Sequence, residues 1–133
     1  MALDTTITPT ITHPGTTGIR IPMSPALVTG SYAANDTEYH SMVFETMGKR
    51  FLTYYVDNPS DKDVVVTLYG SSDGALHVDD VGVFLIGTSF TSSAGSYEHD
   101  TTDEGAMFYI IRCKTAVASA TGTTVTVHAH LMQ

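Results

Sequence analysis

The stretch that decides the fold class runs from Thr123 to Leu131 and reads TTVTVHAHL. Two sets of side chains alternate strictly within it, because every second position is apolar and the positions between carry threonine or histidine. Side chains of a strand point alternately to its two faces, so this stretch predicts a strand with one face in a core and the other in water. The core set is Val125, Val127, Ala129 and Leu131, and the solvent set is Thr124, Thr126, His128 and His130.

Similar short runs lie upstream, and turn residues separate them. The run AMFYIIRCK at 106–114 predicts one long central strand, and VVVTLY at 64–69 carries three stiff β-branched valines that suit a pleated surface. The cluster from Asp57 to Asp61 predicts a loop in which an Asx side chain bonds its own backbone. No window has sustained helical periodicity, although 24–34 and 75–80 could each hold a helical turn. The other expected strands are 39–46, 50–56, 81–88 and a weaker one at 90–97.

Seven or eight antiparallel strands predict two packed sheets, since one open sheet of that size would leave an apolar face in water. We therefore expect an all-β protein, with an antiparallel β-sandwich similar to a jelly roll at residues 31–133. Residues 1–30 differ, because they are rich in Thr, Pro and Gly, and proline at that density excludes a helix. We expect them to form an extended N-terminal arm, the alternative being a disordered tail.

Charge and composition restrict the partners. The chain has 14 acidic and 6 basic residues, and the resulting charge of -8 repels nucleic acid and anionic lipid. Only 15% of its residues are charged, which favours contact with other protein. The start has neither a basic region nor an apolar core, so we expect no signal peptide, and the apolar runs are too short for a membrane span. The single Cys113 lies in an apolar run, where a buried small side chain is expected.

Candidate catalytic patterns have simpler explanations. The spacing Gly70-x-Ser72-x-Gly74 matches a hydrolase nucleophile elbow, but that motif needs a helix after the turn, and here a second strand is expected. The sequence shows no glycine-rich phosphate loop before a helix, and no spacing singles out a carboxylate pair. We expect no enzyme activity and no cofactor.

Metal sites are possible at two kinds of position. His128 and His130 point to one side of a strand about 6.5 to 7 Å apart, which suits zinc if a third ligand comes from His40, His77 or His99. Calcium could bind acidic loops, whose residues are Asp57, Asp61 and Asp63 in one case and Asp100, Asp103 and Glu104 in the other. Neither acidic group has EF-hand spacing, and exposed histidines and solvated turns are ordinary. We expect no metal.

A family resemblance lies in residues 51–131. Its carriers are YVDNPS at 55–60, VVV-x-LYGS-x-DG at 64–74, FYIIR at 108–112 and GTTVTV at 122–127. With these the chain resembles the small β-sandwich auxiliary proteins of tailed bacteriophage virions, of the head decoration or cement type. The resemblance implies a non-enzymatic structural protein that is made in the host cytoplasm, becomes part of the virion and stabilises the assembled shell.

The resemblance also implies partners and contact residues. The partner would be the major capsid protein or another virion protein, and the decoration protein would be a homo-oligomer, with a trimer favoured. Terminal arms of such proteins lie on the capsid or add a strand to it. The expected arm contacts are Leu3, Ile7, Ile11, Ile19 and Ile21, and the expected acidic loop contacts are Glu98, Asp100, Asp103 and Glu104. The alternative function is a glycan- or cell-surface-binding β-sandwich module of a fibre or tail protein.

Overall fold

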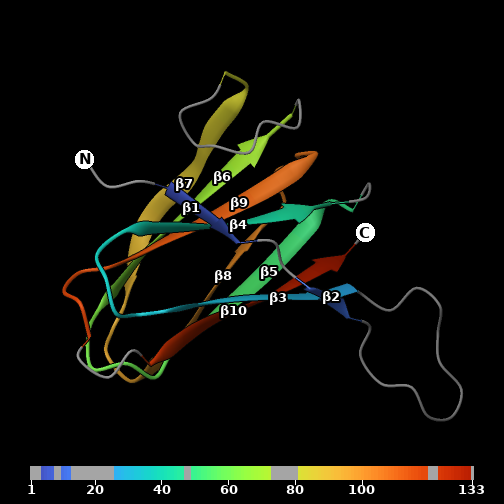
Figure 1. Cartoon of the computed structure of the whole chain (residues 1–133). Helices are drawn as coiled ribbons and strands as arrows, with labels where there is room; N and C mark the ends of the chain where they lie inside the picture. The colour runs from blue at the N-terminus through green and yellow to red at the C-terminus, as the bar shows by residue number, and fades with distance from the viewer. Residues whose placement is uncertain are drawn as a thin grey trace, which may run out of the picture.

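The structure is a computed structural model that describes residues 4–7, 10–12, 26–46, 49–72, 81–119 and 123–132. Throughout these segments the chain is β-structure and connections, and it forms two five-stranded sheets that face each other (Figure 1). None of these segments contains a helix long and apolar enough to cross a membrane. The predicted all-β sandwich is confirmed.

The first sheet, called sheet A here, has the strand order β1-β4-β9-β6-β7. β1 runs parallel to β4, and the other neighbours are antiparallel. β9 lies between β4 and β6, so the long central strand expected at 106–114 is confirmed. The bounds are β1 Asp4–Ile7, β4 Tyr39–Glu45, β9 Phe108–Thr115, β6 Val64–Ser71 and β7 Val83–Ser92.

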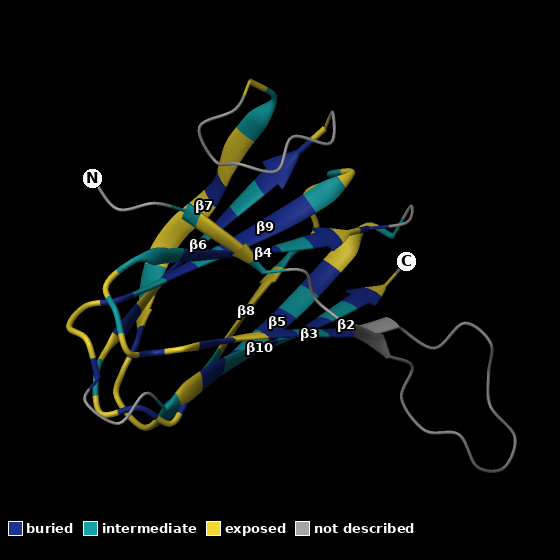
Figure 2. Cartoon of the chain, in the orientation of Figure 1, coloured by how far each residue is buried: buried dark blue, intermediate teal, exposed yellow. Residues whose placement is uncertain are grey.

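The second sheet, called sheet B here, has the order β2-β3-β10-β5-β8, and all its pairs are antiparallel. β10 is the strand whose alternation opened the sequence analysis, and its four apolar side chains are buried while the residues between them face solvent (Figure 2). The bounds are β2 Thr10–Thr12, β3 Ala26–Ala33, β10 Thr124–Met132, β5 Phe51–Asn58 and β8 Ser96–Thr102.

The core lies between the two sheets and takes one face of each strand. β9 contributes Tyr109, Ile111 and Cys113, which pack with apolar side chains of both sheets. Burial raises the pKa of the Cys113 thiol to about 12, so the thiolate is scarce at neutral pH. Ile110 is also fully buried but does not belong to this core cluster. The other large side chains of the core are Val28, Tyr32, Met42, Phe44, Leu52, Tyr54, Val56, Val64, Val66, Leu68, Ile86, Val125, Val127 and Leu131.

The sequence left a helical turn possible at 24–34, and this is corrected by the structure, in which residues 26–33 form the strand β3. Val28, Gly30 and Tyr32 alternate with less buried residues, and all three face the core. A side chain at Gly30 would place its Cβ 3.0 Å from the sulfur of Met42, so the small residue allows the two sheets to approach here. β3 also extends across residue 30, where the boundary between arm and sandwich was predicted.

Two expected strands, 81–88 and 90–97, are in fact the single strand β7 followed by the start of β8. β7 continues through an irregularity at which its register with β6 shifts between Val66 and Leu68. Gly87 lies in this irregular part of β7 with a positive φ of 66°, which glycine adopts without strain. The turn that ends β7 comes later, and Gly95 has a φ of 71° there.

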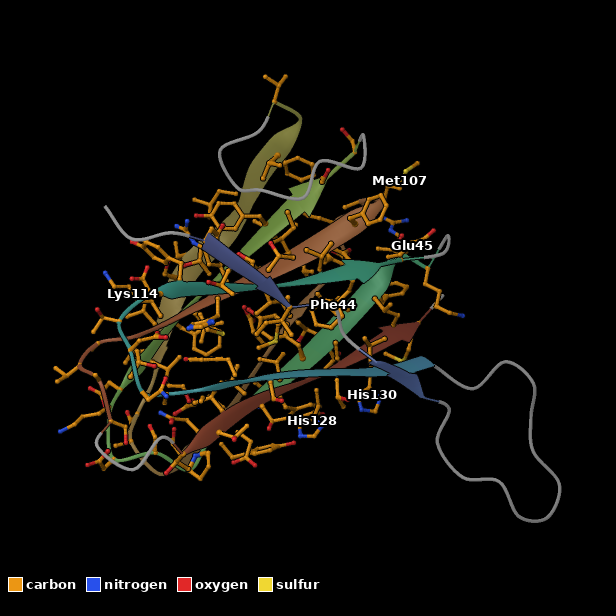
Figure 3. All side chains as sticks on the ribbon, in the orientation of Figure 1. Phe44, Glu45, Met107, Lys114, His128 and His130 are labelled. Carbon is orange, nitrogen blue, oxygen red and sulfur yellow. The ribbon has the colours of Figure 1, made fainter. Side chains whose placement is uncertain are left out.

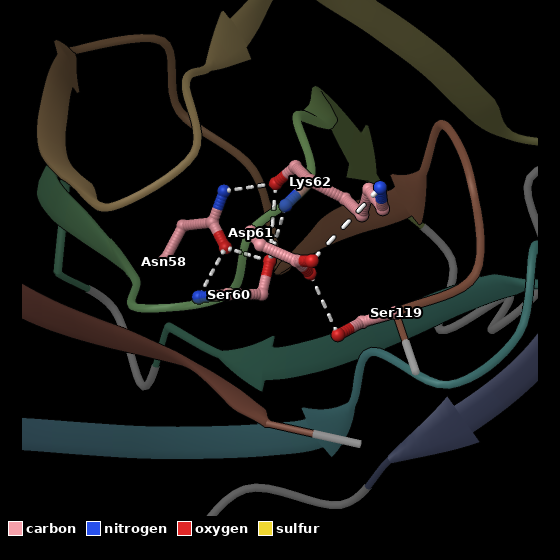
Figure 4. A network of polar contacts seen from close by, with 5 residues as sticks. All are labelled: Asn58, Ser60, Asp61, Lys62 and Ser119. Atoms are coloured by element: carbon pink, nitrogen blue, oxygen red, sulfur yellow. Dashed lines mark hydrogen bonds and ion pairs between the residues drawn. The ribbon is translucent and has the colours of Figure 1, made fainter. Parts of the chain in front are cut away.

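The loop predicted at 57–61 is confirmed in part, because Asp57 and Asn58 still belong to β5 and the connection begins at Pro59; the predicted Asx turn is visible in Figure 4. The Asn58 side-chain oxygen accepts hydrogen bonds from the Ser60 N–H (3.2 Å) and the Ser60 hydroxyl (2.6 Å). Its amide nitrogen donates to the carbonyls of Lys62 (2.8 Å) and Ser92 (3.1 Å). Because Asn58 is fully buried, this side chain ties the β5–β6 connection to the end of β7.

Asn58→Asp tests this connection. The carboxylate loses both amide donors and brings negative charge against carbonyl oxygens in a buried position. We expect the free energy of unfolding at pH 7 to fall by about 3 kcal/mol. Urea denaturation measures this, and Asp61→Asn, at an exposed position of the same loop, serves as the control, with a fall of less than about 1 kcal/mol, because asparagine keeps the oxygen that accepts the Ser119 hydroxyl (2.9 Å). Equal effects would contradict the role given to Asn58.

Ile111→Ala tests the packing of β9. The side chain is fully buried between the sheets, so its truncation leaves a cavity and should lower the unfolding free energy by about 2–5 kcal/mol. Val117→Ala is the matched control, since Val117 is 57% exposed and its truncation should change stability by less than about 0.5 kcal/mol. Thermal or urea unfolding of both variants gives the comparison.

Cys113 provides a test that needs no substitution. Because its thiol is fully buried and its pKa is raised to about 12, Ellman's reagent should leave the native protein unmodified at pH 8. In 6 M guanidinium chloride the same thiol should react within minutes. Rapid labelling of the native protein at pH 8 would show that β9 is not enclosed as described.

Candidate functional site

The candidate site is a cationic cleft on the outer face of sheet A. Side chains of a strand point alternately to its two faces, and since Ile111 and Cys113 of β9 occupy the core, Arg112 and Lys114 must face outward, on the side that also carries the buried Ile110. Antiparallel pairing puts Tyr39 of β4 opposite Lys114 on one side, and Thr67 of β6 opposite Arg112 on the other. Register therefore brings together residues that are far apart in the sequence.

Two tyrosines hold the cations. The guanidinium carbon of Arg112 lies 4.0 Å from the ring centroid of Tyr39 and 5.3 Å from that of Tyr69. Arg112 also donates a hydrogen bond to the Tyr69 hydroxyl (3.1 Å), and the Lys114 ammonium lies 4.9 Å from the Tyr39 ring centroid. Contacts of this kind contribute about 0.5–1 kcal/mol at exposed positions, and here they fix the orientation of the charged groups.

The cleft has a volume of about 410 Å³ and is half open to solvent. This volume lies within the range of about 300–1,000 Å³ that ligand sites commonly have. Its central hydroxyls belong to Thr67 and Ser89, whose oxygens are 2.7 Å apart. The lining residues are Tyr39, Val65, Thr67, Tyr69, Leu85, Ser89, Arg112 and Lys114.

The two cations of the cleft have no acidic partner within ion-pair distance among the described residues. The ion pairs of that part of the chain are His40 with Asp36 and Lys62 with Asp61. The acid on the adjacent strand β1 is Asp4, which accepts a hydrogen bond from the Ser41 hydroxyl (2.6 Å). Two unneutralised positive charges at a cleft, on a chain of net charge -8, make an anionic ligand the natural complement.

The residues predicted as arm contacts lie in different parts of the chain. Ile7 lies in β1 and packs against the core of this same chain, and Ile11 lies in β2, where its backbone is paired with Val28. Leu3, Ile19 and Ile21 lie outside the described residues. β1 and β2 thus each extend one of the chain's own sheets, and a role of these residues in binding a partner stays a prediction.

The predicted acidic loop is corrected, because half of it is a strand. Glu98 and Asp100 belong to β8, where they pair with Val56 and Tyr54 of β5. Asp103 and Glu104 follow the strand and are exposed. Cross-strand hydrogen bonding outweighs the weak strand preference of acidic residues at the edge of a sheet, where charged residues are common.

The segment after β8 is held to the rest of the fold. Arg50 donates to the carbonyl of Asp103 (3.2 Å), and the Tyr109 hydroxyl donates to the carbonyl of Glu104. These contacts use backbone carbonyls and leave the two carboxylates in solvent. Partner binding by the acidic residues stays a prediction.

The histidine pair lies on the outer face of sheet B (Figure 3). Tyr55 of β5 contacts His130 edge-on, with ring centroids 6.0 Å apart, and a tilted His99, 5.7 Å away, contacts the same tyrosine. His40 is elsewhere, buried against Tyr32, and His77 lies outside the described residues. Among the residues that are described, no three His, Cys, Asp or Glu side chains gather as a metal site, either here or at the acidic positions considered for calcium.

Sequence reasoning did not find the cationic cleft. The available signal was Arg112 and Lys114, which interrupt the most apolar run at alternate positions and are two of the chain's six basic residues. Of the hydrolase pattern, Gly70 lies in β6 and Ser72 follows that strand, while Gly74 lies outside the described residues.

Comparisons with known proteins give distant similarity to solved structures. No family model matches the chain, and no curated protein sequence matches it. Among solved structures, the chain is similar to the crystal structure of Aeromonas hydrophila PliG, a periplasmic lysozyme inhibitor of g-type lysozyme. The two are 13% identical over 99% of this chain and 100% of that chain, with a TM-score of 0.49.

This similarity contradicts the predicted function. The similar structure is an inhibitor of an enzyme and not a capsid decoration protein. The prediction of a virion role, together with its glycan-binding alternative, is therefore corrected. The physical reason is that the resembling stretches form β5, β6, β9 and β10, which any sandwich needs. The predicted homotrimer and location stay predictions.

Proposed function

We propose that this chain is a non-enzymatic binding protein that holds an acidic group of another protein in the cationic cleft of sheet A. The observation that carries the proposal is the pair of cations on the outward face of β9, Arg112 and Lys114, which have no ion pair with an acidic side chain of the described residues. Their neighbours Tyr39 and Tyr69 keep them in place without neutralising them.

The chemistry of the cleft suits carboxylate binding. A guanidinium presents a planar set of N–H donors that a carboxylate can accept in pairs, and such charge-assisted bonds contribute about 1.5–3 kcal/mol each. Because Arg112 already lies between two aromatic rings, less side-chain entropy is lost when a ligand binds. Attraction is local, since the rest of the chain is acidic and charges separated by more than about 8 Å are largely screened in physiological salt.

The lining residues favour binding over catalysis. The polar side chains in the cleft are hydroxyls and cations, and no carboxylate or imidazole is among the described residues that line it. A hydroxyl nucleophile needs a neighbouring base to take its proton, and here the Thr67 and Ser89 hydroxyls bond each other while Lys114 lies against the ring of Tyr39. These contacts support a site that retains its ligand unchanged.

The test uses a blocked five-residue peptide, Gly-Glu-Ser-Leu-Gly, titrated into the 15N-labelled protein. We expect amide shifts at β9, β6 and β4, and a Kd at least about 30-fold weaker in the variant R112Q/K114Q. The control K49Q/K62Q removes the same net charge away from the cleft and should bind within about twofold of the parent protein. Equal weakening in both variants, or shifts confined to other strands, would show that the cleft is not the site.

A further inference from the structure

We infer that the segment bound by the cleft is extended and has an acidic residue followed, two positions later, by an aliphatic residue. This inference rests on the proposed function and names the ligand of the same site. It follows from the two unlike ends of the cleft. Arg112 and Lys114 of β9 form the cationic end, and Leu85 of β7, which is 57% exposed, forms an apolar end.

The spacing of the ends fits an extended chain. β6 lies between β9 and β7, and Leu85 is level with Ile110, two residues along β9 from Arg112, so the backbone positions of Leu85 and Arg112 are about 12 Å apart. Side chains at positions i and i+2 of an extended segment point the same way and are about 6.6–6.8 Å apart. The length of an acidic side chain that reaches toward Arg112 spans the remaining distance, whereas neighbouring positions i and i+1 would point in opposite directions.

The middle of the cleft suits a peptide backbone. Thr67 and Ser89 bond each other through their hydroxyl oxygens, and that bond uses one donor and one acceptor. Each hydroxyl has one hydrogen and two lone pairs, so the pair still offers one donor and several acceptor positions. A peptide unit between the acidic and aliphatic residues has one N–H and one C=O to match them.

The shape and charge of the cleft favour a protein segment as its occupant. The lining includes the exposed Val65, Leu85 and Ser89, so a bound chain can continue into solvent. Leu85 is 57% exposed beside Tyr69 and gives an aliphatic side chain an apolar surface to cover, whereas Val65 is paired with Lys114 at the cationic end. A positive site on an acidic molecule selects an acidic partner segment locally.

The experiment compares three blocked peptides by the same NMR titration. The parent is Gly-Glu-Ser-Leu-Gly, one variant replaces its Glu by Gln, and the other replaces its Leu by Ala. We expect each replacement to weaken binding about tenfold. L85S should weaken binding of the parent peptide about fivefold, yet leave binding of the Leu-to-Ala peptide unchanged, because the two changes remove the same contact. V117S, at an equally exposed apolar position elsewhere, is the matched control and should leave all three affinities unchanged.

The outcomes separate the two proposals. If the Gln peptide bound as well as the parent, the proposed function itself would be overturned. If both Glu peptides bound equally and L85S had no effect, the acidic site would stand and the inference about the aliphatic residue would be overturned. A hexanoate ion that bound more tightly than the parent peptide would also overturn the inference, since the occupant would then be a small amphipathic carboxylate.

Discussion

The two sheets are held together by the side chains that β9 and β10 bury between them. Each strand is central in its sheet, and each places every second residue in the core. This constraint also determines the outer surfaces, because a side chain in the core fixes the direction of its neighbours. Because Ile111 and Cys113 point into the core, Arg112 and Lys114 point to the outer face of sheet A. The candidate site is thus a consequence of the packing that stabilises the fold.

The outer surfaces of the two sheets have different chemistry. Sheet A presents the cationic cleft, whereas sheet B presents Tyr55 with histidines on either side of it. Tyr97 of β8 stacks on Tyr55 with ring centroids 5.5 Å apart. The buried core separates these surfaces, so a ligand held on one leaves the other accessible.

The sequence predicted the fold wherever alternation was strong. β10 was found because its apolar side chains alternate, β9 because its apolar run is rich in aromatic and β-branched residues, and the Asx turn at Asn58 because its chemistry is local. β8 was missed, since acidic and hydroxyl residues have weak strand preference and only pairing with β5 decides their state. The cleft was missed for a related reason. Its residues come from four strands, and register, which a single sequence does not specify, determines that Tyr39 meets Lys114.

The position of β8 at the rim of sheet B affects how the molecule behaves in a crowded solution. The outer side of an edge strand has backbone N–H and C=O groups that no neighbouring strand uses, and a strand of another molecule can pair with them. In β8 that edge runs alongside Glu98, His99 and Asp100. A second strand could dock there only by removing water from these groups, which is unfavourable. The charged rim therefore keeps neighbouring copies apart and helps a protein built almost wholly of strands to resist fibre formation.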